Sequence, residues 1–273
     1  MTMQDEIITI YVICDDYLKD MNYEDNEQAE ITTAEVMTIA LVSARLFKNC
    51  LEHSREFLIE ESYIHKISES RLNRRLHAIP EGIWLGLFYR MAKIHKMANI
   101  GQEYAVDSMP VAICDNYRIK RCRLYQDKAF RGYIASKRRY FYGLRLHVVI
   151  TSYGMPVDLV LAPGADADIS AFKRLHLDLP DGSMIYADKA YTDYVCEDVM
   201  NQDTQINLTA MRKSNSKRPM DGCLHYICHR VRKQIETTFS QIADSFAKRI
   251  YAITAKGAEL KAFLAVLAFS ICV

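Results

Sequence analysis

The spacing of apolar residues changes near residue 100, and this change limits the possible folds more than any other feature. Before it, apolar side chains recur every three or four residues, as in amphipathic helices. After it, runs rich in β-branched and aromatic residues alternate with helical segments and turn residues. A chain of 273 residues is long enough for one large or two modest domains. We therefore predict a helical region over residues 1–100 and an α/β domain over residues 101–273.

The N-terminal region is predicted to be all-α. The expected helices cover residues 1–20, 33–47, 54–61, 71–79 and 81–99. The helix over 71–79 places Leu72 and Leu76 on one face and three arginines on the other, namely Arg71, Arg74 and Arg75. After a short helix and a turn, this pattern is typical of the DNA-reading helix of a helix-turn-helix. Because any basic surface helix has the same pattern, DNA contact and a solvated face are both open interpretations.

The second region is predicted to contain a mixed sheet flanked by helices. Strands are expected over residues 104–109, 139–150, 157–161, 183–187 and 205–209. Asp166 or Asp168 is expected to cap a helix that runs to His176. Further helices are expected from Tyr191 or Asp193 to about Asn201 and over residues 226–246.

Charge is unevenly distributed along the chain. The net charge is +1, but residues 1–35 carry −9 and the remainder carries +10. The most basic stretch runs from Arg118 to Arg145, with ten Lys or Arg and one acid, and tyrosines and phenylalanines lie among the bases. Bases attract phosphates and aromatic rings can stack on nucleobases, so this stretch predicts DNA contact, above all through Lys137, Arg138 and Arg139. A solvated basic loop is the alternative.

Two further patterns concern location and metals. The N-terminus is acidic rather than basic, and the longest apolar run, residues 262–273, is shorter than a bilayer requires, so we expect a cytosolic protein without a membrane span. Cys223, His225, Cys228 and His229 lie within seven residues but lack paired zinc-ligand spacing. This cluster is either a metal site or a basic loop entering a helix.

Three acids lie at positions where chemistry is expected. Asp107 interrupts an apolar strand, where a charge costs free energy unless something binds it. Asp188 ends the strand over 183–187, and Glu236 lies within the long helix, one turn after Arg232. Ligand sites form at the carboxyl ends of strands, and carboxylate oxygens suit Mg²⁺. The alternative is three unrelated acids near one edge of the sheet.

Five segments together resemble the DDE transposases of bacterial insertion sequences, most closely the insertion-sequence nine-eighty-two family. They are VDSMPVAIC, FYGLRLHVVI, GMPVDLVLAPGADADISAF, YADKAY and RKQIETTFSQI, and the resemblance covers about residues 60 to 270. It implies an RNase H-like catalytic domain in which Asp107, Asp188 and Glu236 bind Mg²⁺, or Mn²⁺ in its place. It also implies a transposase that cleaves the terminal inverted repeats of its element and joins the 3′-hydroxyls to target DNA.

The resemblance carries further expectations for partners and site residues. It implies double-stranded DNA as partner, a homodimer on that DNA, and a bacterial cytoplasmic location associated with the nucleoid. Arg232 is expected to orient Glu236 or a DNA phosphate, and Lys189, beside Asp188, to contact DNA.

One motif of related families is only partly present. Their Tyr-x2-Arg-x3-Glu-x6-Lys pattern aligns with His229, Arg232 and Glu236, but Ala243 stands where the lysine would fall. Lys248 or Arg249 is a candidate replacement.

Two other functions are compatible with the same pattern. One is a nuclease of this fold that hydrolyses DNA without strand transfer, and the other is an inactive DNA-binding descendant, which the presence of all three acids disfavours.

Overall fold

The chain forms two compact units. The computed structural model describes residues 2–25, 28–135, 137–246 and 250–272. The first unit comprises Met1–Met91, Gln241–Lys248 and Leu260–Val273, and the second comprises Ala92–Ser240 and Arg249–Glu259. The units therefore do not follow a single cut near residue 100, because the C-terminal segment groups with the N-terminal helices.

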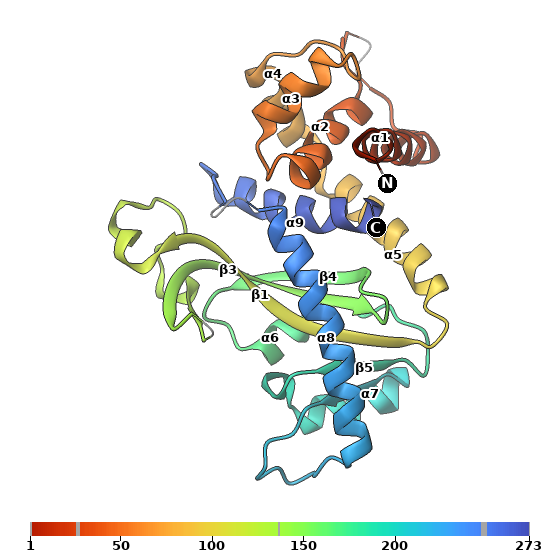
Figure 1. Cartoon of the computed structure of the whole chain (residues 1–273), viewed down its shortest axis with the longest axis vertical. Coiled ribbons are helices and arrows are strands. Elements are labelled where there is room, and N and C mark those ends of the chain that lie inside the picture. Colours follow the sequence, from red (N-terminus) through yellow and green to blue (C-terminus); the bar gives the residue numbers. More distant parts are fainter. Residues whose placement is uncertain (1, 26–27, 136, 247–249, 273) are drawn as a thin grey trace. The chain divides into compact units, whose positions relative to one another are not determined.

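The first unit is built from helices around an apolar interior (Figure 1). Its helices are α1 (Met3–Asp20), α2 (Thr33–Leu46), α3 (Leu51–Glu60), α4 (Glu69–Ala78), α5 (Glu81–Ala98, as far as Met91) and α9 (Ala255–Cys272, from Leu260). Helix α2 begins with a capping box, in which Thr32 accepts from the Glu35 N–H and the Glu35 carboxylate accepts from the Thr32 N–H. In α9, residues 262–272 are buried, and Phe263 packs edge-on against Phe88 at 5.9 Å between ring centroids.

Helix α4 shows the predicted two-faced pattern, with Leu72 and Leu76 buried. Residues 61–68 connect α3 to α4, which is longer than the three- or four-residue turn of a helix-turn-helix. Arg75 bonds inside the unit, to the Ile31 carbonyl and, at 2.9 Å, to Asp25. Arg74 is exposed, and the exposed Arg71 has a 3.4 Å contact with Glu30.

No helix in the described part of the chain is both long enough and apolar enough to cross a membrane.

The second unit is a mixed sheet with helices on both sides. Its strands are β1 (Glu103–Asp115), β2 (Arg131–Ile134), β3 (Arg139–Thr151), β4 (Pro156–Pro163), β5 (Met184–Ala187) and β6 (Asn207–Ala210). The α-helices that accompany the sheet are α6 (Asp168–Phe172), α7 (Tyr194–Thr204) and α8 (Gly222–Asp244, as far as Ser240). Short 3₁₀ turns are η1 (Asn116–Arg121), η2 (Lys128–Phe130) and η3 (Lys189–Tyr191). Strand β2, inside the basic stretch, was not expected from the sequence.

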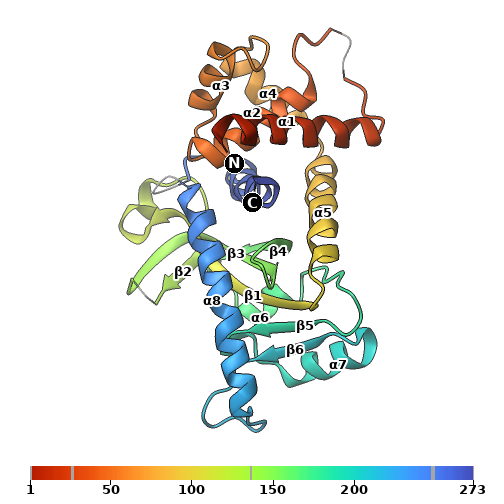
Figure 2. The same cartoon turned by 45° about the vertical axis from the view of Figure 1, so that its right-hand side comes forward.

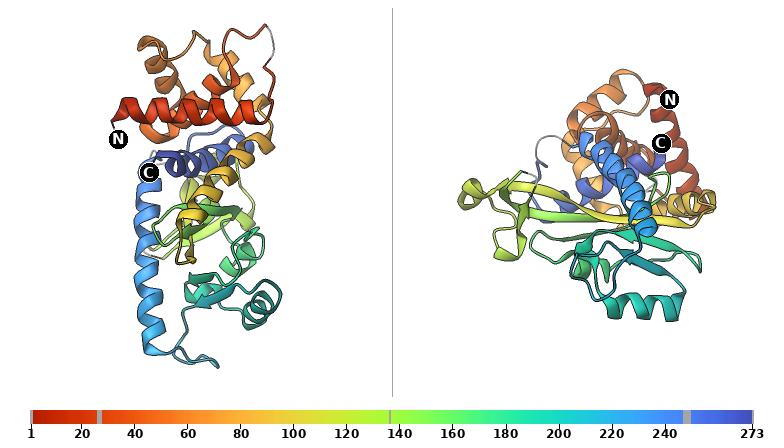
Figure 3. Two further views of the ribbon diagram at one scale, coloured as in Figure 1. Left: turned by 90° about the vertical axis from the view of Figure 1, so that its right-hand side faces the viewer. Right: turned by 60° about the horizontal axis from the view of Figure 1, so that its bottom comes forward.

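The strands follow the order β2-β3-β1-β5-β6, and β4 also pairs with β3. Strand β3 is antiparallel to β1, β2 and β4, whereas β1, β5 and β6 run parallel to one another. Helix α8 lies on one side of this sheet and α6 and α7 lie on the other (Figures 2 and 3). A mixed α/β fold, as predicted, is confirmed.

Strand β1 is more than twice as long as predicted, and its two ends have different neighbours. On β1, strand β5 pairs only with Glu103–Val106, whereas β3 follows β1 as far as Asp115. Pro110 is tolerated in this strand because β1 has a single neighbour there.

Gly143 of β3 lies opposite Ala112, where the register shifts. Its φ is +154°, and a Cβ there would lie 2.3 Å from the Val111 carbonyl oxygen. Glycine is therefore required at this bend.

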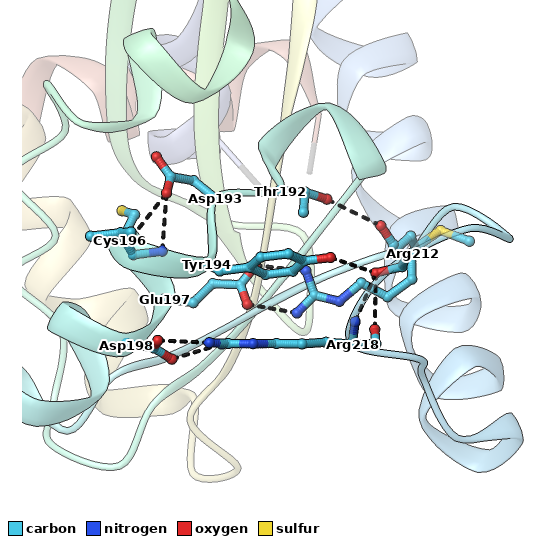
Figure 4. Close-up of polar contacts among 11 residues, drawn as sticks. Thr192, Asp193, Tyr194, Cys196, Glu197, Asp198, Arg212 and Arg218 are labelled. Atoms are coloured by element: carbon cyan, nitrogen blue, oxygen red, sulfur yellow. Dashed lines mark hydrogen bonds and ion pairs between the residues drawn. The ribbon is translucent and has the colours of Figure 1, made fainter.

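A layered set of ion pairs fastens the loop that leads from β6 into α8 (Figure 4). Arg212 donates to both carboxylate oxygens of Glu197 at 2.7 and 2.6 Å, and Arg218 donates to both of Asp198 at 2.7 and 2.8 Å. Both guanidinium groups lie over the ring of Tyr194, at 5.2 and 4.8 Å from its centroid. The loop is thus held to α7, and this fixes where α8 begins.

We expect the two ion pairs to differ strongly in their effect on stability. Glu197→Gln leaves Arg212 charged and mostly buried (13 % exposed), so it should lower the free energy of unfolding by about 3–5 kcal/mol. Asp198→Asn, at the pair whose side chains are 47 % and 52 % exposed, is the matched control and should change it little. Urea unfolding of the full-length protein measures both, and equal effects would contradict the assignment of the Glu197 pair as the buried clamp.

Candidate active site

Asp107 and Asp188 are brought side by side by the pairing of β1 with β5. The last residues paired in this parallel ladder are Val106 and Ala187, and each aspartate is the next residue of its chain segment. Asp188 also caps η3, where its carboxylate accepts from the Lys189 N–H at 2.7 Å. Residues 81 positions apart in the sequence therefore meet where the parallel pairing of β1 with β5 ends, at the carboxyl end of β5, and ligand sites are expected at such strand ends.

Arg232 of α8 connects the two aspartates. Its guanidinium lies 3.4 Å from the Asp107 carboxylate and 3.6 Å from the Asp188 carboxylate. The side chain is 19 % exposed, and its Nε is buried without a hydrogen-bond partner in the described part of the chain. A single cation thus contacts two carboxylates and offsets part of the repulsion between them.

The Asp107 carboxyl is in an environment that disfavours its charge. Burial raises its pKa above the ordinary value, and the negative charge of Asp188 acts in the same direction. The Ser108 N–H, which donates to the carboxylate at 2.8 Å, and the charge of Arg232 lower the pKa but do not fully compensate. A cation between these two carboxylates is therefore stabilised.

Glu236 lies one helical turn after Arg232 on α8. Residues four apart lie on the same face of a helix, so Glu236 is directed to the side of α8 from which Arg232 reaches the aspartates. Its side chain is exposed, and it has no hydrogen bond or ion pair with the described residues. The structure thus brings Asp107 and Asp188 together around Arg232, whereas Glu236 lies outside this group of contacts, one turn further along α8.

The donor atoms at this position fit a divalent cation, although a complete metal site is not assembled. Carboxylate oxygens are the preferred ligands of Mg²⁺, and the Arg232 guanidinium shows that the position attracts positive charge. Across the residues that the structure describes, no three His, Cys, Asp or Glu side chains are close enough to hold a metal ion. This finding includes the Cys and His cluster at the start of α8, where Cys223 is exposed and Cys228 is buried.

A second polar network lies on the opposite face of β1. Adjacent residues of a strand point to opposite faces, so Ser108 points away from the Asp107 side. Its hydroxyl donates to the Asp168 carboxylate at 3.0 Å, and Arg145 lies 3.4 Å from the same oxygen.

The prediction of Asp166 or Asp168 as a helix cap was wrong. The N-cap of α6 is Ala167, and the Asp168 carboxylate instead bonds to the sheet.

His147 links this network to the turn that carries Asp188. The imidazole is fully buried in β3, and its Nδ1 lies 3.0 Å from the hydroxyl of Tyr191, the last residue of η3. Its Nε2 has no hydrogen-bond partner among the described residues and lies 3.9 Å from Asp168. Sequence reasoning missed this network, and the only signal for it was the closeness of Ser108 to Asp107 and of Tyr191 to Asp188 along the chain.

The remaining predicted site residues lie elsewhere in the second unit or outside the described residues. Lys189 is exposed next to Asp188, and Lys137, Arg138 and Arg139 lie at the far end of the β2–β3 pair. Lys248 and Arg249, the candidate replacements for the missing lysine, lie outside the described residues.

The sheet order and the paired aspartates define an α/β domain with an acidic site at the edge of a mixed sheet. A family model described as "Transposase DDE domain" matches residues 97–249, more than half of the chain, and the chain therefore belongs to this transposase family. Comparisons with curated proteins and with solved structures gave no significant match.

The buried histidine generates a prediction about pH. Burial lowers the pKa of His147 to about 4, against about 6.5 for an unperturbed histidine. Between these values the unfolded chain binds a proton that the folded chain does not. The contribution of the His147 imidazole to the free energy of unfolding is therefore complete above pH 6.5. It is lost as the pH falls toward 4, by up to about 1.4 kcal/mol per pH unit.

The measurement is the midpoint of urea unfolding from pH 7 to pH 4 in the wild type and in His147→Gln, which cannot titrate. The variant should show a flatter profile in this window. An NMR titration of the His147 ring that gives an ordinary pKa would contradict the prediction.

Proposed function

We propose that this chain is a metal-dependent DDE transposase that cleaves the ends of a DNA element and joins the resulting 3′-hydroxyls to target DNA. The observation that carries the proposal is the meeting of Asp107 and Asp188 on Arg232, inside the segment that matches the DDE transposase domain. The sequence of strands and helices, with an acid in β1, an acid after β5 and a glutamate on the following long helix, supports an RNase H-like catalytic unit.

We assign the catalytic carboxylates to Asp107, Asp188 and Glu236, which would hold Mg²⁺ or Mn²⁺. When bound, such a metal activates a water or a 3′-hydroxyl and stabilises the departing oxygen of the phosphodiester. The chain itself provides the fixed distance between Asp107 and Asp188, through the β1–β5 ladder, and an exposed third carboxylate on α8. It needs no serine or tyrosine nucleophile for this reaction.

Arg232 has two roles in this proposal. Without a metal, its guanidinium contacts both aspartates and offsets the repulsion between them. With a divalent cation held by the carboxylates, the guanidinium would be available for a DNA phosphate, which it can bind in a bidentate manner.

DNA contact is assigned to exposed lysine and arginine side chains of both units. In the second unit these are Lys189, Lys137, Arg138 and Arg139, although Arg139 also has a 3.7 Å ion pair with Asp115. In the first unit we assign α4 to the terminal inverted repeats through Arg71 and Arg74, whereas Arg75 serves mainly to join α4 to Asp25 and Thr33. A homodimer on DNA, in a bacterial cytoplasm and at the nucleoid, completes the proposal.

Removing any one of the three carboxylate charges should abolish the chemistry and leave DNA binding intact. Asp107→Asn, Asp188→Asn and Glu236→Gln keep the shape of each side chain but weaken the hold on a divalent cation. We expect cleavage and strand transfer to fall to background, with binding of a duplex carrying the element end changed by no more than a few fold. Asp181→Asn, at an exposed acid before the opposite end of β5, is the matched control and should be fully active.

The same assay separates the alternatives. Cleavage without joining in the wild type would indicate a nuclease, and binding without either reaction would indicate an inactive descendant. Near-normal strand transfer by one of the three variants would remove that residue from the catalytic set.

The exposed lysines and arginines should also determine the salt dependence of DNA binding. Replacing Lys137, Arg138 and Arg139 with alanine should flatten the slope of log K against log salt by up to about 0.9 for each DNA phosphate that the variant no longer neutralises. Lys173→Ala, at a lysine of the same unit that pairs with Asp193 at 2.7 Å, is the control and should leave the slope unchanged. A slope that stays the same in the triple variant would exclude this segment from phosphate binding.

A further inference from the structure

The second unit carries a ribbon of strands that extends beyond its parallel part. Strand β5 reaches only as far as Val106 on β1, but β1 and β3 stay paired up to Asp115 and Phe141. Strand β2 then adds to the outer side of β3 over Arg131–Ile134. Figures 1 and 3 show this ribbon projecting from the rest of the sheet. Its end is therefore accessible to a partner.

Two tyrosines lie directly opposite each other on this ribbon. Tyr133 of β2 pairs in register with Tyr140 of β3, and their rings are 4.9 Å apart between centroids. The two side chains are 43 % and 46 % exposed, so both rings are within reach of a ligand. The Arg131 guanidinium covers one face of Tyr140 at 4.1 Å from the centroid, which holds that ring in place.

The same arrangement of a tyrosine and an arginine recurs on η1, which adjoins the ribbon. Tyr117 is 75 % exposed, and the Arg118 guanidinium lies 5.6 Å from the centroid of its ring. Exposed aromatic faces next to arginine thus occur on two neighbouring elements of the basic stretch.

The charge around these rings limits the partner that they can bind. The stretch from Arg118 to Arg145 carries +9, and its one acid, Asp127, is engaged in capping η2. Such a surface repels cationic and favours polyanionic partners. Aromatic rings among phosphate-binding lysines and arginines are the combination that binds single-stranded nucleic acid, because every nucleobase has a π-face on which a ring can stack. A continuous duplex hides these faces within its own stack.

We propose that Tyr133 and Tyr140 form a stacking platform for unpaired bases of DNA, with Arg131 holding the platform in place. This inference rests on the proposed function, because cleavage at an element end is the step that supplies unpaired or unstacked nucleotides. The ribbon then binds DNA in two ways, through phosphate contacts at its end and through base stacking on its face.

The test compares two fluorescent probes with the full-length protein, a short oligothymidine and a random-sequence duplex of the same length. The double variant Tyr133→Ser with Tyr140→Ser should bind the oligothymidine about tenfold or more weakly, as expected for the loss of base stacking. It should bind the duplex within about twofold of the wild type, because phosphate binding does not involve the rings. Tyr153→Ser, at an exposed tyrosine beyond the other end of β3, should leave both affinities unchanged.

A second pair of variants separates stacking from a structural role of the tyrosines. Cross-strand aromatic pairs also stabilise strand pairing, so the serine variants can weaken the ribbon itself. Tyr133→Phe with Tyr140→Phe keeps the rings and should retain oligothymidine binding. Phenylalanine variants as weak as the serine variants, equal losses on both probes, or no loss at all would each overturn the proposal.

The outcome is independent of the proposed catalysis. A wild-type protein that binds the duplex but not the oligothymidine overturns the stacking platform and leaves the transposase proposal standing. A protein that binds both probes as described but shows no metal-dependent cleavage retains the platform and overturns the catalytic proposal.

Discussion

The arrangement of the second unit depends on how two carboxylates are tolerated next to each other at the end of a sheet. The β1–β5 ladder places Asp107 beside Asp188, and burial makes the charge of Asp107 costly. Arg232 offsets that cost, and it can do so only if α8 lies across this end of the sheet. The ladder places the two aspartates, α8 carries the arginine that contacts both, and the loop that Arg212 fastens to Glu197 leads into α8. All three elements therefore serve to keep these two carboxylates beside a positive charge.

The sequence predicted the elements that depend on local patterns. The helix start near Thr32 and the apolar, β-branched run of β3 are encoded within a few residues, and both are found where expected. The acids Asp107 and Asp188 were recognised because a charge in or after an apolar strand is locally anomalous. Their meeting at the sheet edge follows from the parallel order of β1 and β5.

The features that escaped prediction depend on distant partners. Strand β2 has few local signals because it is short and basic, and it is a strand only through its pairing with β3. Asp168 has the sequence context of a cap, but its carboxylate bonds to Ser108, sixty positions away, so the local preference is overridden. Likewise, nothing in the sequence near α9 shows that its residues from Leu260 belong with helices of the first hundred residues.

The bend at Gly143 separates two parts of the second unit that can change independently. On one side, the register of β1 with β5 fixes the acidic edge, and on the other, the ribbon is held mainly by main-chain pairing between β1, β2 and β3. Because main-chain pairing tolerates many side chains, substitutions or changes of length in the ribbon need not disturb Asp107 or Asp188. The ribbon can therefore change in sequence or length while the geometry of the acidic edge is kept.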